Sequence, residues 1–149
     1  MILKNYINGR FAPSRYATVR PFLNPADNSE IGQVAESSIE DVETAIHAAR
    51  KAFDEGPWPR TPAQERAAKL LKLAALIDSR AAQLAEFESR NNGKPLREAE
   101  YDVADAAGCF RYYAGLATKP HGQTFEVGDP NTVCQTVRES IGVCGQIIP

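Results

Sequence analysis

The chain has 149 residues, of which 43% are hydrophobic and 24% are charged, a composition typical of globular proteins and not of disordered ones. Its net charge of −2 gives no overall attraction toward nucleic acids or anionic membranes, so we expect neither as a partner. No apolar run approaches the roughly 20 residues of a transmembrane helix, and the first residues lack the pattern of a secretory leader.

Short strands are expected at the front of the chain. The pair Asn8-Gly9 favours a type I′ turn, which predicts a tight hairpin over Tyr6–Phe11. Further extended segments are expected at Val19–Leu23 and Glu30–Ala35, with a turn that begins at Asn24-Pro25 between them.

About four helices are expected next. Ser38 and Asp41 have the spacing of a capping box, and Pro62 favours the first position of a second helix. A break near Asp78 can divide that helix in two, and Asn92-Gly93 ends the run. A last helix begins at Pro95, and its expected apolar stripe consists of Leu96, Ala99, Val103, Ala106, Phe110 and Tyr113.

Two different strands are expected after the helices. Thr132–Arg138 alternates between apolar and polar residues, which is typical of a strand covered on one face. Gly142–Ile148 is apolar on both sides, which favours a parallel strand buried between helices. A parallel partner needs a crossover of about a dozen residues or more, and none follows, so the pattern predicts the front piece of a larger α/β protein.

Several short motifs, in order along nearly the whole chain, carry a resemblance to a known family. They include YINGRF at Tyr6–Phe11, NGKP at Asn92–Pro95, FRYYAG at Phe110–Gly115 and GVCGQIIP at Gly142–Pro149. With this order and spacing, the sequence resembles the N-terminal portion of the NAD(P)-dependent aldehyde dehydrogenases.

The resemblance implies an α/β fold class and a helix-rich N-terminal fragment of that fold. Residues 1–23 and 130–139 would supply strands of the oligomerisation sheet, which implies a homo-oligomer. Residues 24–129 would form the helical part of the NAD-binding domain, and residues 140–149 the first strand of its dinucleotide-binding sheet.

The reaction implied by the resemblance is oxidation of an aldehyde to a carboxylate with NAD or NADP, through a thiohemiacetal on a cysteine thiolate. In the family, the nucleophilic Cys, the general-base Glu and the Asn of the oxyanion hole all lie beyond the stretch that matches GVCGQIIP. We therefore expect this chain alone to be inactive and to bind the cofactor poorly.

Two groups of site residues follow from the resemblance. Ile147, Ile148 and Pro149 match the strand end that borders the cofactor; the alternative is that they are core residues. Tyr101, Asp102 and Asp105 match a helix beside the substrate tunnel, where an acidic pair can meet the cationic end of an aminoaldehyde. The alternative for this helix is a solvated acidic face.

The cysteines and a cation position complete the candidates. Cys109, Cys134 and Cys144 are expected to be reduced, inert core residues of a cytoplasmic protein, and none matches the catalytic position. Some family members bind a monovalent cation at the positions of Phe22, Leu23 and Asn91. The backbone carbonyls at these positions can still serve as ligands, but Asn91 stands where those members have a carboxylate, and the loss of that charge weakens the expectation of a cation.

Three hypotheses of different kinds remain at this point. The chain can be part of an aldehyde-oxidising enzyme. It can instead be a non-catalytic interaction module that associates with full-length aldehyde dehydrogenase subunits through its strand edges. The third possibility is a small independent domain with another function.

Overall fold

The computed structural model describes residues 2–16 and 18–148. Three short strands near the N-terminus lie side by side in the order β1 (Ile2–Leu3), β5 (Glu30–Ala35) and β4 (Val19–Leu23). β1 runs parallel to β5, whereas β4 runs antiparallel to it. The two longer strands confirm the sequence prediction. β1 was not predicted, because two residues are too few to show alternation.

The predicted hairpin is present as β2 (Asn5–Ile7) and β3 (Arg10–Ala12). Ile7 lies opposite Arg10, so the loop contains two residues only. Asn8 and Gly9 have φ angles of 52° and 77°, the two positive values that a type I′ turn requires. The local signal therefore specified this turn without help from the rest of the chain.

Helices occupy the middle of the chain, and each boundary has a local cause. The Ser38 side chain accepts the N–H of Asp41 and the Asp41 side chain accepts the N–H of Ser38, which confirms the capping box. Gly93 ends the third α-helix at φ 79°, where a residue with a side chain would be strained. The elements are α1 (Ile39–Asp54), the 3₁₀ helix η1 (Trp58–Arg60), α2 (Ala63–Ser79), α3 (Ala81–Asn92) and α4 (Leu96–Leu116).

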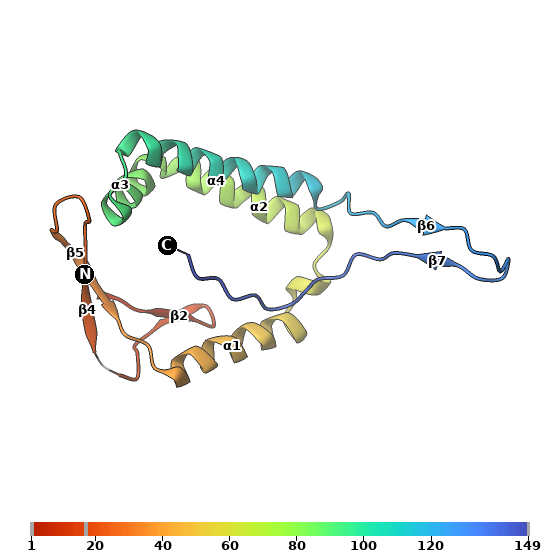
Figure 1. Cartoon of the computed structure of the whole chain (residues 1–149), viewed down its shortest axis with the longest axis horizontal. Coiled ribbons are helices and arrows are strands. Elements are labelled where there is room, and N and C mark those ends of the chain that lie inside the picture. Colours follow the sequence, from red (N-terminus) through yellow and green to blue (C-terminus); the bar gives the residue numbers. More distant parts are fainter. Residues whose placement is uncertain (1, 17, 149) are drawn as a thin grey trace.

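The helices α2, α3 and α4 pack as one layer, with α1 and the β2–β3 hairpin on the other side of the molecule (Figure 1). The predicted break near Asp78 is confirmed, because α2 ends at Ser79 and α3 begins at Ala81. Pro62 precedes α2 instead of being its first residue, and the short helix η1 was not predicted. A one-residue difference at a helix end is within ordinary fraying.

The core of this layer is small and built largely from alanines. Ala85, Ala99 and Val103 are buried together, and Ile77 and Leu84 pack against them. Alanine side chains allow helices to approach closely while still burying apolar surface. The buried residues of α4 are Ala99, Val103, Ala107 and Ala114.

Part of the predicted stripe of α4 is wrong. Leu96, Ala106 and Tyr113 are exposed, and Ala107 and Ala114 are buried instead. The four buried residues recur at intervals of four and seven and face α2 and α3, because these helices lie on one side of α4 only. The periodicity was read correctly, but a second apolar face on α4 misled the choice of residues.

The chain beyond α4 forms a narrow ribbon that projects away from the helices and an extended segment that returns toward them (Figure 1). β6 (Thr124–Phe125) pairs antiparallel with β7 (Cys134–Gln135), so the strand predicted over Thr132–Arg138 is shorter than expected, and β6 was not predicted.

The apolar stretch Gly142–Ile148 is extended, but it is not a strand in the described part of the chain. Ile147 and Ile148 expose 104% and 81% of their surface, where burial between helices was expected. Residues 137–148 form no backbone–backbone hydrogen bond with other described residues, and without a paired neighbour an extended segment cannot become a ladder. The assignment of residues 140–149 to a dinucleotide-binding sheet stays a prediction.

Candidate functional site

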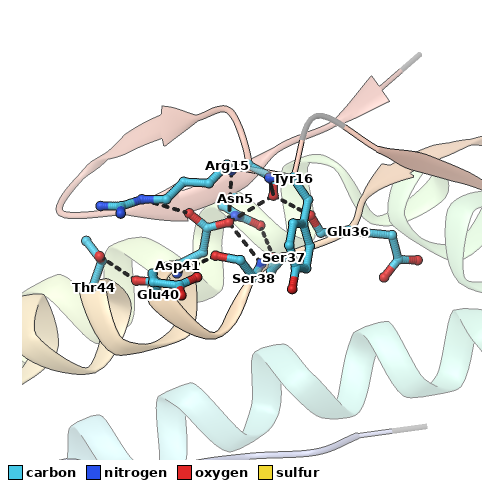
Figure 2. A network of polar contacts seen from close by, with 10 residues as sticks. Asn5, Arg15, Tyr16, Glu36, Ser37, Ser38, Glu40, Asp41 and Thr44 are labelled. Atoms are coloured by element: carbon cyan, nitrogen blue, oxygen red, sulfur yellow. Dashed lines mark hydrogen bonds and ion pairs between the residues drawn. The ribbon is translucent and has the colours of Figure 1, made fainter.

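A polar network joins the N-terminus of α1 to the segment after the hairpin (Figure 2). The Asp41 carboxylate accepts hydrogen bonds from the N–H groups of Ser38 and Arg15, each at 3.0 Å, and from the Ser14 hydroxyl at 2.8 Å. The donation from the Ser38 N–H, and then that from Arg15, lower the pKa of Asp41 below its usual value of 3.8. A carboxylate that stays ionised and accepts three hydrogen bonds holds two segments of the chain together, and it is poorly suited to act as an acid or base.

The residues predicted to line a substrate tunnel lie on the outer face of α4. Tyr101 and Tyr112 expose 65% and 63% of their surface, and Asp102 and Asp105 are exposed too. Positions 101, 105 and 112 recur at helical spacing, so the Asp105 carboxylate lies along the same stripe as the two tyrosines. The structure therefore brings the predicted residues together on one side of one helix.

The two aspartates of this face differ in their charge partners. Asp102 pairs with the ammonium group of Lys94, whose Nζ also lies 3.0 Å from the Glu88 carboxylate. Asp105 has no ion pair within residues 2–16 and 18–148. Sequence reasoning treated the aspartates as an equivalent pair and did not single out Lys94. The sequence position of Lys94, one residue before the proline that precedes α4, could have indicated a pairing with an acidic residue in the first turns of that helix.

The predicted cofactor residues lie at the free end of the extended segment. Ile147 and Ile148 expose apolar side chains, which suits one border of a nucleotide site. Pro149 lies outside the described residues. The assignment of these residues to the border of a cofactor site stays a prediction.

The three cysteines do not form a core, which corrects the sequence interpretation. Cys109, Cys134 and Cys144 are all exposed and unpaired. Cys109 lies on the outer face of α4, Cys134 lies in the two-stranded ribbon, and Cys144 lies in the segment without strand partners. Their exposure has one physical cause: each lies on an element whose second side has no neighbour in the described part of the chain.

The residues at the predicted cation position come from two turns that meet. Leu23 ends β4 just before the Asn24-Pro25 turn, and Asn91 lies at the end of α3. These turns touch, because a Cβ at Gly93 would lie 2.8 Å from Pro25 Cγ. Within the described residues, His, Cys, Asp and Glu side chains nowhere gather in threes around a possible metal position.

The family of the chain is decided by a comparison with protein families. Residues 11–149 match the aldehyde dehydrogenase family. The chain belongs to this family. None of the helices in the described part of this aldehyde dehydrogenase chain is both long and apolar enough to cross a bilayer.

Curated relatives of this aldehyde dehydrogenase chain are considerably longer than the chain itself. It is 44% identical over 147 residues to the mitochondrial benzaldehyde dehydrogenase of Antirrhinum majus, covering 98% of the chain and 27% of that protein. It is 42% identical over 144 residues to the betaine aldehyde dehydrogenase of Bacillus subtilis (strain 168), covering 97% of the chain and 29% of that protein. The chain therefore spans less than a third of the length of these relatives.

Solved structures of dehydrogenases share the fold of the aldehyde dehydrogenase chain. The betaine aldehyde dehydrogenase of Staphylococcus aureus, in complex with NAD+, superposes with a TM-score of 0.82 at 34% identity, over 89% of the chain and 26% of that protein. The NAD-dependent aldehyde dehydrogenase of Sinorhizobium meliloti superposes equally well, at 32% identity and over 27% of its length. The arrangement of helices and small sheets is therefore that of part of the aldehyde dehydrogenase fold.

Proposed function

We propose that this chain is the N-terminal part of an NAD(P)-dependent enzyme that oxidises aldehydes to carboxylates through a cysteine thiohemiacetal. One observation carries the proposal: the relatives match almost every residue of the chain, yet the chain accounts for only 27–29% of their length. In the proposed enzyme, residues 24–129 form the helical part of the NAD-binding domain. Residues 1–23 and 130–139 belong to the oligomerisation sheet of a homo-oligomer, and residues 140–149 begin the dinucleotide-binding sheet.

By itself the chain is proposed to be inactive. The described cysteines lie on three separate elements, and no candidate base is hydrogen-bonded to any of their thiols. A thiolate nucleophile needs a neighbouring positive group or base to be active, as well as donors for the oxyanion. Ile147 and Ile148 offer only one apolar border to a dinucleotide, so weak cofactor binding is expected too.

The substrate class proposed is aldehydes with a cationic end. Tyr101 and Asp105 lie one turn apart on the outer face of α4, and a carboxylate near an aromatic side chain suits a quaternary ammonium or ammonium group. The similarity to betaine aldehyde dehydrogenases supports this choice, because betaine aldehyde carries such a group.

The experiment compares the 149-residue chain with the protein isolated from its natural source, whose intact mass is measured first. Both are assayed for aldehyde-dependent formation of reduced NAD and reduced NADP. The proposal expects a natural protein of about the relatives' length that turns over an aldehyde, and no turnover by the short chain. Aldehyde oxidation by the purified 149-residue chain alone would contradict it.

A second candidate function is a non-catalytic module that associates with full-length aldehyde dehydrogenase subunits. The observation that favours it is the exposed apolar surface of the final residues, including Val133, Ile141 and Ile147. Mixing the chain with a full-length family member and separating by size distinguishes the candidates: a stoichiometric complex supports the module, whereas a chain that elutes alone opposes it.

A further inference from the structure

Two Asn-Gly pairs occur in the sequence, and the structure places them in very different surroundings. Asn8-Gly9 forms the whole loop of the β2–β3 hairpin, whereas Asn92-Gly93 joins the end of α3 to the turn before α4. In such a pair the backbone nitrogen of the glycine can attack the side-chain amide carbon of the asparagine, because glycine has no Cβ to shield that nitrogen. The two pairs are chemically alike, so a difference in their reactivity must come from the fold.

Both ends of the Asn92 side-chain amide are hydrogen-bonded. Its Nδ2 donates to Glu88 Oε1 at 2.7 Å, and its Oδ1 accepts the N–H of Lys94 at 2.8 Å. The nitrogen that would attack, that of Gly93, donates its proton to the Ser89 carbonyl at 2.9 Å. Attack at Asn92 therefore requires three hydrogen bonds to break at the end of a helix.

The space around the two glycines differs as well. A Cβ at Gly93 would lie 2.8 Å from Pro25 Cγ, so this turn is packed tightly against the turn after β4. A Cβ at Gly9 would meet no atom within 4 Å apart from those of its chain neighbours. The five-membered ring that forms during attack, and a longer backbone after it, therefore fit at Gly9 and have no room at Gly93.

The Asn8 amide and the Gly9 nitrogen are both available for reaction. Both residues are exposed, and within the described residues neither the Asn8 side chain nor the Gly9 N–H forms a hydrogen bond. The strand pairing of the hairpin ends at Ile7 and Arg10, on either side of the loop. Because exposed loop residues without such bonds open at little cost in free energy, Asn8 can rotate into the geometry that attack requires.

We infer that Asn8 is a site of spontaneous modification and that the fold protects Asn92 from the same reaction. The Gly9 nitrogen loses its proton to water or hydroxide and bonds to Asn8 Cγ; the Cγ–Nδ2 bond breaks, and the amide nitrogen takes up a proton and leaves as ammonia. Water then opens the resulting succinimide ring. Opening at Cγ gives aspartate, whereas opening at the backbone carbonyl carbon gives isoaspartate, and either product adds one negative charge to the hairpin loop.

The two products differ in their effect on the hairpin. Asp-Gly is compatible with a type I′ turn, so aspartate retains the two-residue loop. Isoaspartate lengthens the backbone by one carbon, so Ile7 and Arg10 no longer close the loop in their present register. The loop residues line a groove together with Ala45 and Ala49 of α1, so a longer loop also changes the surface that the hairpin presents to this helix.

The test follows both asparagines in the purified 149-residue chain, kept folded in mildly alkaline buffer and sampled over days. Peptide mapping by mass spectrometry measures the fraction converted at each position, and chromatography separates aspartate from isoaspartate. In the folded chain, Asn8 is expected to convert at least about tenfold faster than Asn92. In the chain unfolded in guanidinium chloride, the two rates are expected to agree within about threefold, because the fold no longer distinguishes the two pairs.

Variants identify the cause of the protection. Glu88→Ala removes the acceptor of the Asn92 amide and is expected to speed conversion of Asn92 at least about threefold, while conversion of Asn8 is unchanged. Glu86→Ala, at an exposed position of the same helix, is the matched control and should change neither rate. Asn8→Gln is expected to remove the first acidic species that isoelectric focusing resolves, since glutamine closes the corresponding ring far more slowly.

Equal rates at the two asparagines in the folded chain would overturn the inference, and so would faster conversion of Asn92. The same conclusion follows if Asn8 stays intact in the folded chain during a period in which it converts in the unfolded chain. An Asn92 rate that Glu88→Ala leaves unchanged would refute the role of the side-chain hydrogen bonds in the protection. If Glu88→Ala does not fold, the comparison of folded and unfolded wild type still decides.

Discussion

Two regions of the molecule, the helical unit of residues 63–116 and the C-terminal arm of residues 118–148, bury their apolar residues to very different extents. The helical unit buries Ala74, Ala85 and Ala99 completely or almost completely among its own helices. The arm leaves Ile141 and Ile147 almost fully exposed and forms one two-stranded ribbon. The difference is therefore one of degree: the helical unit covers its small apolar residues with its own helices but leaves larger ones such as Leu71 and Phe87 about half exposed, whereas the arm covers almost none.

The largest expected difference between the two regions is in amide hydrogen exchange. Amides of α4 near Ala107 are hydrogen-bonded within a packed helix, whereas residues 137–148 have no backbone partner among the described residues. We expect exchange in the arm to be about a thousandfold faster or more, measured on the 149-residue chain by mass spectrometry or NMR. If amides of the arm in a monomer were protected as strongly as those of α4, the arm would be hydrogen-bonded, and the contrast between the two regions would be wrong.

Overpacking of the helical core is the next largest effect. Ala99→Leu adds volume at a position with no exposed surface, so we expect the free energy of unfolding to fall by about 1–3 kcal/mol in urea titrations. Ala104→Leu, on the exposed side of the same helix, is the matched control and should change stability by less than about 0.5 kcal/mol. Similar losses for both substitutions would mean that the helices do not pack as described.

Loss of the cap of α1 is expected to have a moderate effect. Ser38 is buried and its hydroxyl accepts the N–H of Asp41 at 3.2 Å, so Ser38→Ala should lower stability by about 1 kcal/mol. Ser79→Ala at the end of α2 removes a hydroxyl that only donates to the Leu76 carbonyl on an exposed turn, and it should be nearly neutral. Circular dichroism during urea unfolding measures the free energy of unfolding of both variants. No change for Ser38→Ala would show that the cap does not stabilise the chain.

The smallest expected effect is a dependence on pH that comes from Asp41. Its pKa is lowered in the folded chain, so the stability that it contributes is fully present above its usual value of 3.8 and is lost as the pH falls below that value toward the folded pKa. The stability difference between wild type and Asp41→Asn should therefore shrink as acid is added below this pH, as followed by helix content. A difference that stays constant through the acid range would show that the carboxylate charge is irrelevant there.

Local signals in the sequence were sufficient for much of the fold. Asn8-Gly9 specified the hairpin, Ser38 and Asp41 specified the start of α1, and Gly93 specified the end of α3, because each acts within a few residues of itself. The parallel pairing of Ile2–Leu3 with β5 could not be foreseen, since it depends on residues about 30 positions away.

The helical placement of the candidate residues was predictable, but their ion pairs were not, and their role in a site stays a prediction. Tyr101, Asp102 and Asp105 were placed correctly on one side of a helix, whose spacing the sequence reveals. The pairing of Lys94 with Asp102 depends on how the turn between two helices folds back, and no periodicity encodes that. The exposure of Cys109, Cys134 and Cys144 was missed for a related reason: an apolar neighbourhood in sequence does not guarantee a covered neighbourhood in space.

The contact between Gly93 and Pro25 has a consequence for mutation and design. The smallest possible side chain at position 93 would place its carbon 2.8 Å from Pro25 Cγ, with a backbone φ of 79° that side chains resist. Such a side chain would push the turn that follows β4 away from the turn between α3 and α4. The turn after β4 and the turn before α4 therefore leave no room for a side chain at position 93, and a substitution there would displace residues of both turns.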